Sequence, residues 1–343
     1  MLGNTERLIF ISLLGLLVFT TRSAAQSFNF TTIDVPCSAM LPTSCPNGVA
    51  QQTVANGINP AGDIVGVYTD GVGKQHGFLL SGGQFTTMDV PGALAGVVGT
   101  LPTSANGINP AGEIVGNYTA PYVPTVSDKA PQDSPTYCPS AGVPACIKGF
   151  LYRHGKFSTV LFPGHPGAVP QRITPDGDIY GCLHDFDFMN SMFGAIWGQA
   201  GDSSLTANGG ELADPSQSMP SSMNNGATPG GHMIVGLWDD MNGHRHGLVV
   251  QDGVFQSYDV PGSILTAIWD INPNQQFVGT YIDNSGHRHG FLQLPDGSAP
   301  INVDYPGSAA TLPFGNNPEG AIVGRYLASG HVHGFVALPV STN

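Results

Sequence analysis

Short apolar runs separated by turn residues recur along this chain, and residues 55–92 show the pattern most clearly. Their sequence is ANGINPAGDIVGVYTDGVGKQHGFLLSGGQFTTMDVPG. The Pro-Ala-Gly and Gly-Gly groups mark turns, so the segment predicts four short strands joined by three turns. A segment that recurs at a regular period is the unit of a repeat fold, and the period decides the fold class.

Six copies of this segment can be aligned along the chain, and we number them repeat units one to six. Their second strands end at Gly66, Gly116, Gly181, Gly236, Gly279 and Gly324. The spacings of 50, 65, 55, 43 and 45 residues indicate a core unit that carries insertions. The first turn, as in Asn59–Gly62, has Asn, Pro and Gly at the first, second and fourth positions that type I turns prefer.

The last strand of most units ends in proline, as in Asp89–Pro91. Proline cannot donate a hydrogen bond to a neighbouring strand, so this strand is expected to be an edge or to stop there. Four antiparallel strands with an outer edge, repeated every 40–50 residues or so, are typical of a β-propeller blade.

The two ends of the chain complement each other. Residues Phe28–Pro36 have a last-strand sequence, whereas the C-terminus stops soon after a third strand, His333–Val336. The N-terminal strand is therefore expected to complete unit six and to close the ring, which removes an exposed edge. The predicted fold is an all-β, six-bladed β-propeller with four-stranded blades, in which residues 26–343 form a single domain.

These motifs resemble a known repeat. The patterns GINxxGxIVGxY, HGFL and FxTxDVPGA, as in Gly57–Tyr68, His76–Leu79 and Phe85–Ala93, look like the HAF-type extracellular repeat of secreted bacterial proteins. The resemblance covers essentially residues 28–340 and implies an extracellular protein, but no defined chemistry. Unit three departs most from the pattern, because its third strand is Gly194–Trp197 and no DVPG follows it.

Residues 1–25 have the pattern of a secretory signal peptide. An apolar run, Leu8–Phe19, follows Arg7 and precedes the small residues Ser23–Ala25. The run is too short to span a bilayer. We expect cleavage after Ala25, a secreted protein that is extracellular or periplasmic, and no membrane span after cleavage.

Composition and cysteine spacing narrow the choice of partners and compartment. The net charge of −13 argues against nucleic acid or an anionic membrane as partner, because both need basic patches. Cys37 and Cys45 are eight residues apart, as are Cys138 and Cys146, which predicts two local disulfides in an oxidising compartment. Cys182 remains, either as a buried thiol or as a reactive or metal-ligating one.

Long insertions distinguish one face of the predicted propeller from the other. They are residues 37–53, 120–147, 185–193 and 212–222. Each follows a second strand or precedes a first strand, so all four are expected on the same face, where both disulfides would hold them. Because loops on a rigid scaffold carry function, a ligand site is expected on this face.

Histidines recur in the third strands and allow two interpretations. In the first, each histidine bonds the aspartate that ends the second strand, in a structural network. In the second, pairs of histidines two residues apart bind a metal from one strand face. The residues are His76, His246, His289 and His333, preceded in three units by His244, His287 and His331, with Asp70, Asp239 and Asp283 as the aspartates. No HExxH or CxxC spacing occurs, so we predict no metal site and no cofactor, with a structural Ca²⁺ as the alternative.

Units three and five break the repeat in their first strands, which are expected to line a central channel. Where units one and two have Asn-Gly, these units have Gln171-Arg172 and Trp269-Asp270. A buried charge persists only when it is paired or hydrogen-bonded. Arg172 and Asp270 are therefore expected either to pair with each other or with neighbours, or to bind a ligand together with Trp269.

The ends of two second strands supply further candidates. His184, Asp185 and Asp187 of unit three offer a general base or metal ligands, unless the carboxylates are simply solvated. Trp238 and Asp239 of unit four combine an aromatic ring with a carboxylate, which suits a sugar or another polar ligand. Alternatively, the Trp238 ring packs between blades.

No sequence signature of a common enzyme class is present: the chain has no G-x-S-x-G, P-loop or dinucleotide-binding pattern. The expected function is that of a monomeric, secreted module that binds an unidentified protein or carbohydrate. The alternative is an extracellular hydrolase or lyase that acts on a carbohydrate or lactone-like substrate, so the sequence leaves enzymatic activity open.

Overall fold

The computed structural model describes residues 26–39, 45, 48–123, 137–138, 145–162, 167–184, 192–198, 201–204, 221–240 and 242–340. In these ranges the regular structure consists of strands β1–β24 and three single-turn 3-10 helices, η1 (Cys37–Ala39), η2 (Gly92–Ala95) and η3 (Pro229–Gly231). The prediction of an all-β fold is confirmed.

The strands fall into four sets, one for each position in the repeat unit. The first strands are β2 (Gln52–Ile58), β6 (Thr103–Ile108), β10 (Gly167–Ile173), β14 (Ser221–Ala227), β18 (Ser263–Ile271) and β22 (Ala310–Asn316). The second strands are β3 (Ile64–Thr69), β7 (Ile114–Pro121), β11 (Ile179–His184), β15 (Met233–Asp239), β19 (Phe277–Asp283) and β23 (Ile322–Ala328). The third strands are β4 (Gln75–Ser81), β8 (Ala145–Arg153), β12 (Met192–Gly198), β16 (Arg245–Gln251), β20 (Arg288–Gln293) and β24 (His331–Pro339). The fourth strands are β5 (Gln84–Met88), β9 (Lys156–Val160), β13 (Gly201–Ser204), β17 (Val254–Tyr258), β21 (Ile301–Asn302) and β1 (Phe28–Ile33).

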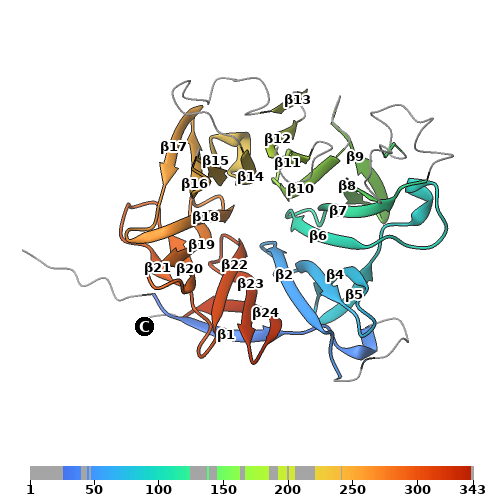
Figure 1. Cartoon of the computed structure of the whole chain (residues 1–343), viewed down its shortest axis with the longest axis horizontal. Helices are drawn as coiled ribbons and strands as arrows, with labels where there is room; N and C mark the ends of the chain where they lie inside the picture. The colour runs from blue at the N-terminus through green and yellow to red at the C-terminus, as the bar shows by residue number, and fades with distance from the viewer. Residues whose placement is uncertain are drawn as a thin grey trace, which may run out of the picture.

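Each repeat unit pairs its four strands in antiparallel order, from first to fourth. Figure 1 shows the first strands around a common centre and the fourth strands at the periphery. Units two, three and four form separate sheets, whereas units five, six and one are joined into one sheet by single parallel bridges, Arg288 to Ala310 and Val332 to Gln52.

The fourth strand of unit six comes from the opposite end of the chain. Strand β1 pairs with β24 in a register that runs from Phe28 opposite Pro339 to Ile33 opposite Gly334. Next to this pairing, His333 Nδ1 and Asp34 Oδ2 lie 2.9 Å apart. The first and last strands of the described chain therefore belong to one sheet.

Among the described residues, the core consists of six apolar clusters, each shared by two successive units. One contains Val65 and Met88 of unit one with Ala105 and Ile114 of unit two. Another contains residues of units six and one, including Val323 packed with residues of β2 and β3. Burial of apolar surface between sheets, which contributes about 25 cal/mol per Å², therefore stabilises each unit through its neighbours.

The IVG and HGF motifs of the repeat pack against each other, because the glycine of the first contacts the phenylalanine ring of the second. A Cβ on Gly66 would lie 2.0 Å from the Val54 carbonyl oxygen and 2.6 Å from the Phe78 ring, so a larger residue does not fit. Phe78 is fully buried against this glycine. The same arrangement recurs for Gly116 with Phe150, Gly279 with Phe291 and Gly324 with Phe335.

A β-bulge interrupts the first strand of every unit at the same position. In unit one Ala55 pairs with Gly66 and Gly57 with Val65, so that Asn56 is the extra residue. The equivalent residues in units two to six are Asn106, Gln171, Asn225, Trp269 and Phe314. Bulges of this kind redirect a side chain, and this one repeats around the centre of the molecule.

The residue after the bulge is Gly57 in unit one and glycine in three other units, but Arg172 in unit three and Asp270 in unit five. A Cβ on Gly57 would lie 3.0 Å from the Asn106 carbonyl oxygen, because the first strands of neighbouring units touch at this level. Gly315 of unit six approaches the Asn56 carbonyl oxygen of unit one in the same way. The two charged residues therefore stand at the level where the first strands of neighbouring units touch.

Candidate functional site

Arg172 connects its own repeat unit with four others. Its Nε lies 3.0 Å from Asp270 Oδ1 of unit five, which makes an ion pair across the channel. Its Nη atoms donate to the carbonyl oxygens of Asn106 and Gln171, both at 2.7 Å, of Asn56 at 2.9 Å, and of Phe314. The guanidinium group thus uses its planar fork to join the first strands of units one, two, three, five and six.

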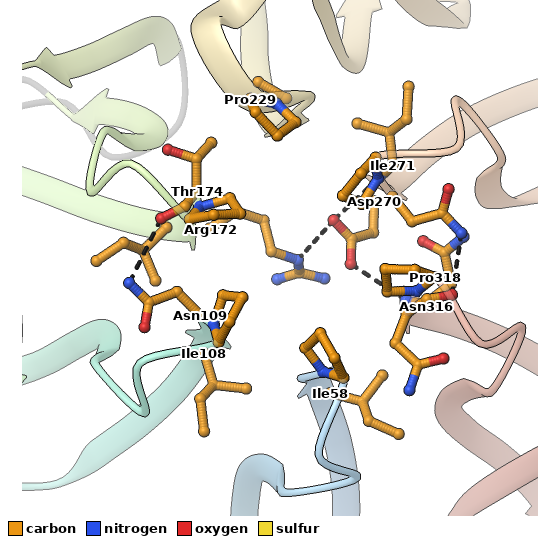
Figure 2. Close-up of a pocket in the computed structure, with 18 residues that line it drawn as sticks. Ile58, Ile108, Asn109, Arg172, Thr174, Pro229, Asp270, Ile271, Asn316 and Pro318 are labelled. Atoms are coloured by element: carbon orange, nitrogen blue, oxygen red, sulfur yellow. Dashed lines mark hydrogen bonds and ion pairs between the residues drawn. The ribbon is translucent and has the colours of Figure 1, made fainter.

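Asp270, the ion-pair partner of Arg172, also accepts hydrogen bonds from two backbone N–H groups. Its Oδ1 accepts a hydrogen bond from the Ile271 N–H at 2.9 Å, and its Oδ2 accepts one from the Asn316 N–H at 3.2 Å. Burial raises the pKa of the Asp270 carboxyl, while the charge of Arg172 and the two backbone N–H groups act in the opposite direction. Figure 2 shows the two side chains pointing toward each other. The ion pair that the sequence offered as one alternative is present.

Cavities lie on both sides of this ion pair. The smaller one, of about 70 Å³, is lined by residues at and beyond the level of Arg172, including Asn109, Pro229 and Pro318 of the first turns (Figure 2). The larger one, of about 260 Å³, is lined by residues that precede this level, such as Val54. First strands begin where second strands end, so the larger cavity lies toward the end of the units to which the predicted insertions attach.

The larger cavity has two chemically different sides. One side carries the amides of Asn56, Asn106 and Gln171 together with the Ser104 hydroxyl. The other carries Trp269 and Phe314, whose rings meet edge to face with centroids 5.3 Å apart. All except Ser104 are bulge residues, so the repeated bulge is what places their side chains here.

Hydrogen bonds fix the amide side. Asn56 Nδ2 donates to the Ala105 carbonyl oxygen at 2.9 Å, and Ser104 Oγ donates to Asn106 Oδ1 at 2.8 Å. Asn106 Nδ2 in turn donates to the Pro170 carbonyl oxygen at 2.8 Å. Within the described chain, the Asn56 Oδ1 atom has no hydrogen-bond partner and remains available to a ligand.

Arg325 adds a positive charge to the aromatic side. Its guanidinium carbon lies 5.6 Å from the Phe314 ring centroid, which is a cation–π distance. Burial, with a smaller contribution from the charge of Arg288, lowers the pKa of Arg325. Among the described residues Arg325 forms no ion pair, and the residues that line the cavity include no Asp or Glu.

The predicted ligand residues are only partly brought together. Trp269 lines the larger cavity beside Arg172, and its Nε1 donates to Thr280 Oγ1 at 3.1 Å. Trp238 is only 4% exposed and packs in the apolar cluster between units three and four, which favours the packing alternative. Asp239 makes a two-pronged ion pair with Arg245, with N–O distances of 2.8 and 3.0 Å. Neither of these two residues lines the channel cavities.

The third-strand histidines form the structural network that the sequence offered as the first interpretation. His76 lies between two carboxylates, with Nδ1 2.8 Å from Asp89 and Nε2 3.4 Å from Asp70. His289 lies in the same way between Asp304 and Asp283, at 2.8 and 3.5 Å. The ring also stacks on the aromatic residue opposite, as His76 does on Tyr68.

One partner in this network was wrongly predicted. In unit four, His246 Nε2 faces Asp240 at 3.8 Å, not Asp239. The turn is the reason: Asp240 Oδ1 accepts the N–H groups of Asn242 and His244, which leaves Oδ2 facing the histidine. Asp239 is one position earlier on the strand and pairs with Arg245 instead.

Several sequence candidates cannot be placed. Asp185 and Asp187 lie outside the described residues, and His184 is described only as the last backbone position of β11. Most of the four insertions also lies outside them. Strand β7 extends to Pro121 and strand β8 begins at Ala145, so the second insertion is shorter than the predicted 120–147.

Both predicted disulfides are present, Cys37 with Cys45 and Cys138 with Cys146. Cys182 is a fully buried thiol, and burial raises its pKa to about 12, which agrees with the structural alternative. Over the described part of the chain, no group of three or more His, Cys, Asp or Glu side chains is arranged to hold a metal ion. In the same part, no helix has the length and hydrophobicity needed to cross a membrane.

Two cations escaped the sequence analysis. Arg325 stands at the position that is Val67 in unit one, after the Ile-Val-Gly motif, and its charge at a position that is uncharged in the other five units was the available signal. Lys148 replaces the repeated histidine in unit two, where it faces Tyr118 as His76 faces Tyr68. Lys148 is 1% exposed, and burial lowers its pKa to about 8.

Comparisons with known proteins define the class of fold. No protein-family model and no curated protein sequence matches the chain. Similar solved structures include TolB from Acinetobacter baumannii, which is 14% identical with a TM-score of 0.51 over 82% of this chain and 64% of TolB. A mutant of AofleA from Arthrobotrys oligospora is 12% identical (TM-score 0.47, 93% and 91% covered), and Trypanosoma rangeli sialidase is 10% identical (TM-score 0.45, 90% and 59% covered). The chain thus spans slightly less than two thirds of the TolB length. At this low sequence identity the likeness shows only the fold, which is all-β and of the β-propeller class.

Proposed function

We propose that this chain is a secreted, six-bladed β-propeller built from HAF-type repeats, and that it binds a small polar ligand of the carbohydrate class in its channel. Six four-stranded units support the blade count. The pairing of β1 with β24 and the apolar cluster shared by units six and one support a closed ring. The two disulfides support an oxidising, non-cytoplasmic location.

The two-sided cavity above the Arg172–Asp270 pair is the observation that carries this proposal. At about 260 Å³ it is slightly smaller than the roughly 300–1,000 Å³ of sites for drug-sized molecules, which suits a monosaccharide or one residue of a glycan. A sugar ring has an apolar face and a rim of hydroxyl groups. Trp269 and Phe314 match the first, and the Asn56, Asn106 and Gln171 amides match the second.

Binding is better supported than glycoside hydrolysis. Most glycoside hydrolases use two carboxyl groups about 5–10 Å apart. Among the described residues that line the two channel cavities, Asp270 is the one carboxylate, and it is engaged by Arg172 and two backbone N–H groups. The cavity therefore offers shape, amides and aromatic surface, which are the elements of recognition.

Tryptophan fluorescence provides a direct test. Of the three tryptophans, Trp197 and Trp238 are buried, so Trp269 is the one placed to respond to a ligand in the cavity. We expect members of a glycan panel to change the emission of the protein, and Trp269→Phe to abolish the change. Trp269→Ala should weaken binding about 10-fold or more, since aromatic packing contributes roughly 1–3 kcal/mol. Binding that survives Trp269→Ala unchanged would contradict the channel site.

A further inference from the structure

We infer that the ligand of this channel carries a carboxylate group and that Arg325 binds it; the inference rests on the proposed function. The class of ligand is then an acidic sugar, such as a uronic acid or a sialic acid at a glycan terminus. The argument depends on the difference between the two guanidinium groups that line the same cavity, Arg172 and Arg325.

The charge of Arg172 is already used by the protein. It is paired with Asp270, and its Nη atoms donate to four carbonyl oxygens of the channel wall. A guanidinium group has five N–H donors. The four hydrogen bonds engage both Nη atoms, and the Nε faces Asp270 in the ion pair, so Arg172 forms the floor of the cavity and has little capacity left for a ligand.

Arg325 is in the opposite situation. It lies over the Phe314 ring, which attracts the cation but accepts no in-plane N–H hydrogen bond, and no carboxylate of the described chain pairs with it. The Phe314 ring lies on one side of the guanidinium group and leaves its N–H donors for another group. Carboxylates match this edge with two parallel hydrogen bonds, which makes them the favoured partner.

The surroundings of Arg325 also oppose any cation as ligand. The residues that line the cavity include no carboxylate, the charge of Arg172 is balanced by Asp270, and Arg288 adds a second positive charge near Arg325. The whole chain carries a formal charge of −13, so this positive cavity contrasts with the rest of the molecule. Low-dielectric cavity walls strengthen the attraction of an anion at such a place.

The repeat itself supplies the test variant. The equivalent residue of unit one is Val67, so Arg325→Val installs a side chain that the same strand position already accepts in this fold. Arg153→Val, which removes one charge from an exposed ion pair with Glu113, is the matched control. Arg325→Lys keeps the charge without the planar fork, and unfolding midpoints of all variants verify that they are folded.

The experiment measures binding of the mature chain and its variants to a panel of uronate-containing, sialylated, sulfated and neutral glycans. We expect the carboxylated glycans to bind, Arg325→Val to weaken them roughly 10- to 150-fold, and Arg325→Lys to weaken them less. Arg153→Val should bind as the wild type does.

The other outcomes separate the inference from the proposed function. Binding of neutral glycans alone, unchanged by Arg325→Val, overturns the carboxylate but leaves a carbohydrate-binding channel. Preferential binding of sulfated glycans also overturns the carboxylate assignment. If no glycan binds, both the inference and the proposed function fall.

Discussion

Removing the Arg172 side chain provides the most demanding test of how the channel is built. Arg172→Met keeps much of the side-chain length but leaves Asp270 as an unpaired charge in a buried site, which costs about 3–5 kcal/mol. The four carbonyl oxygens that lose their donor add less, because water can reach them from the cavities of about 70 and 260 Å³ on either side. The expected loss is at least about a fifth of the stability of a typical protein, which is about 5–15 kcal/mol.

The assay is equilibrium unfolding in urea together with a thermal midpoint, which should fall by about 4–8 °C for a domain of this length. Arg153→Met removes an arginine from an exposed ion pair and should cost less than about 1 kcal/mol. The double variant Arg172→Met/Asp270→Asn should cost less than the sum of the single variants, because the two groups interact directly. If Arg172→Met costs no more than Arg153→Met, Arg172 does not hold the first strands together and the reasoning is refuted.

Two further predictions concern titrating groups. Burial acts to lower the pKa of His289, but the carboxylates of Asp304 and Asp283 outweigh this effect and raise it. The stability that this histidine contributes is therefore complete below its unfolded pKa of about 6.5. It is lost as the pH rises through the folded pKa. An NMR titration should show this elevated pKa of His289 in the wild type and a lower value in Asp304→Asn. Asp252→Asn, which removes an exposed carboxylate elsewhere, should leave the His289 pKa unchanged. A His289 pKa at or below 6.5 in the wild type would contradict the network. Burial raises the pKa of the Cys182 thiol to about 12, so a thiol reagent should label the native protein far more slowly than the unfolded protein. The other four cysteines form disulfides, so one thiol per unfolded chain should react. Rapid labelling of the native protein would show that Cys182 is accessible.

The architecture was predictable because the same sequence motifs recur in successive repeat units. The first turns carry related residues, and units one, two, five and six carry the same Gly–Phe packing pair, as Gly66 with Phe78, so the pattern is visible in several units at once. The pairing of β1 with β24 followed from a fourth-strand sequence at one end of the chain and a missing fourth strand at the other. The disulfides followed from local spacing alone.

The candidate site was less predictable, because it depends on distances between units that no local pattern reports. Arg172 and Asp270 stood out as charges in glycine positions, yet which partner each would take depended on how the repeat units are arranged in space. Arg325 escaped notice because its position lies in a second strand, where a bulky side chain fits either the core or the channel. Trp238 could either bind a ligand or pack between blades on sequence grounds, and its ring packs in the apolar cluster and lies over His246.

The sharing of one sheet by both ends of the chain has a consequence for biosynthesis. A ribosome makes β1 first and β24 last, and contacts such as that between the Thr32 and Tyr326 hydroxyl groups, 2.8 Å apart, join residues separated by 294 positions. Unit six therefore cannot be completed until β24 has been synthesised. The β1 strand has an unpaired edge until then, and a chain that lacks β24 would leave that edge open to pairing with another molecule.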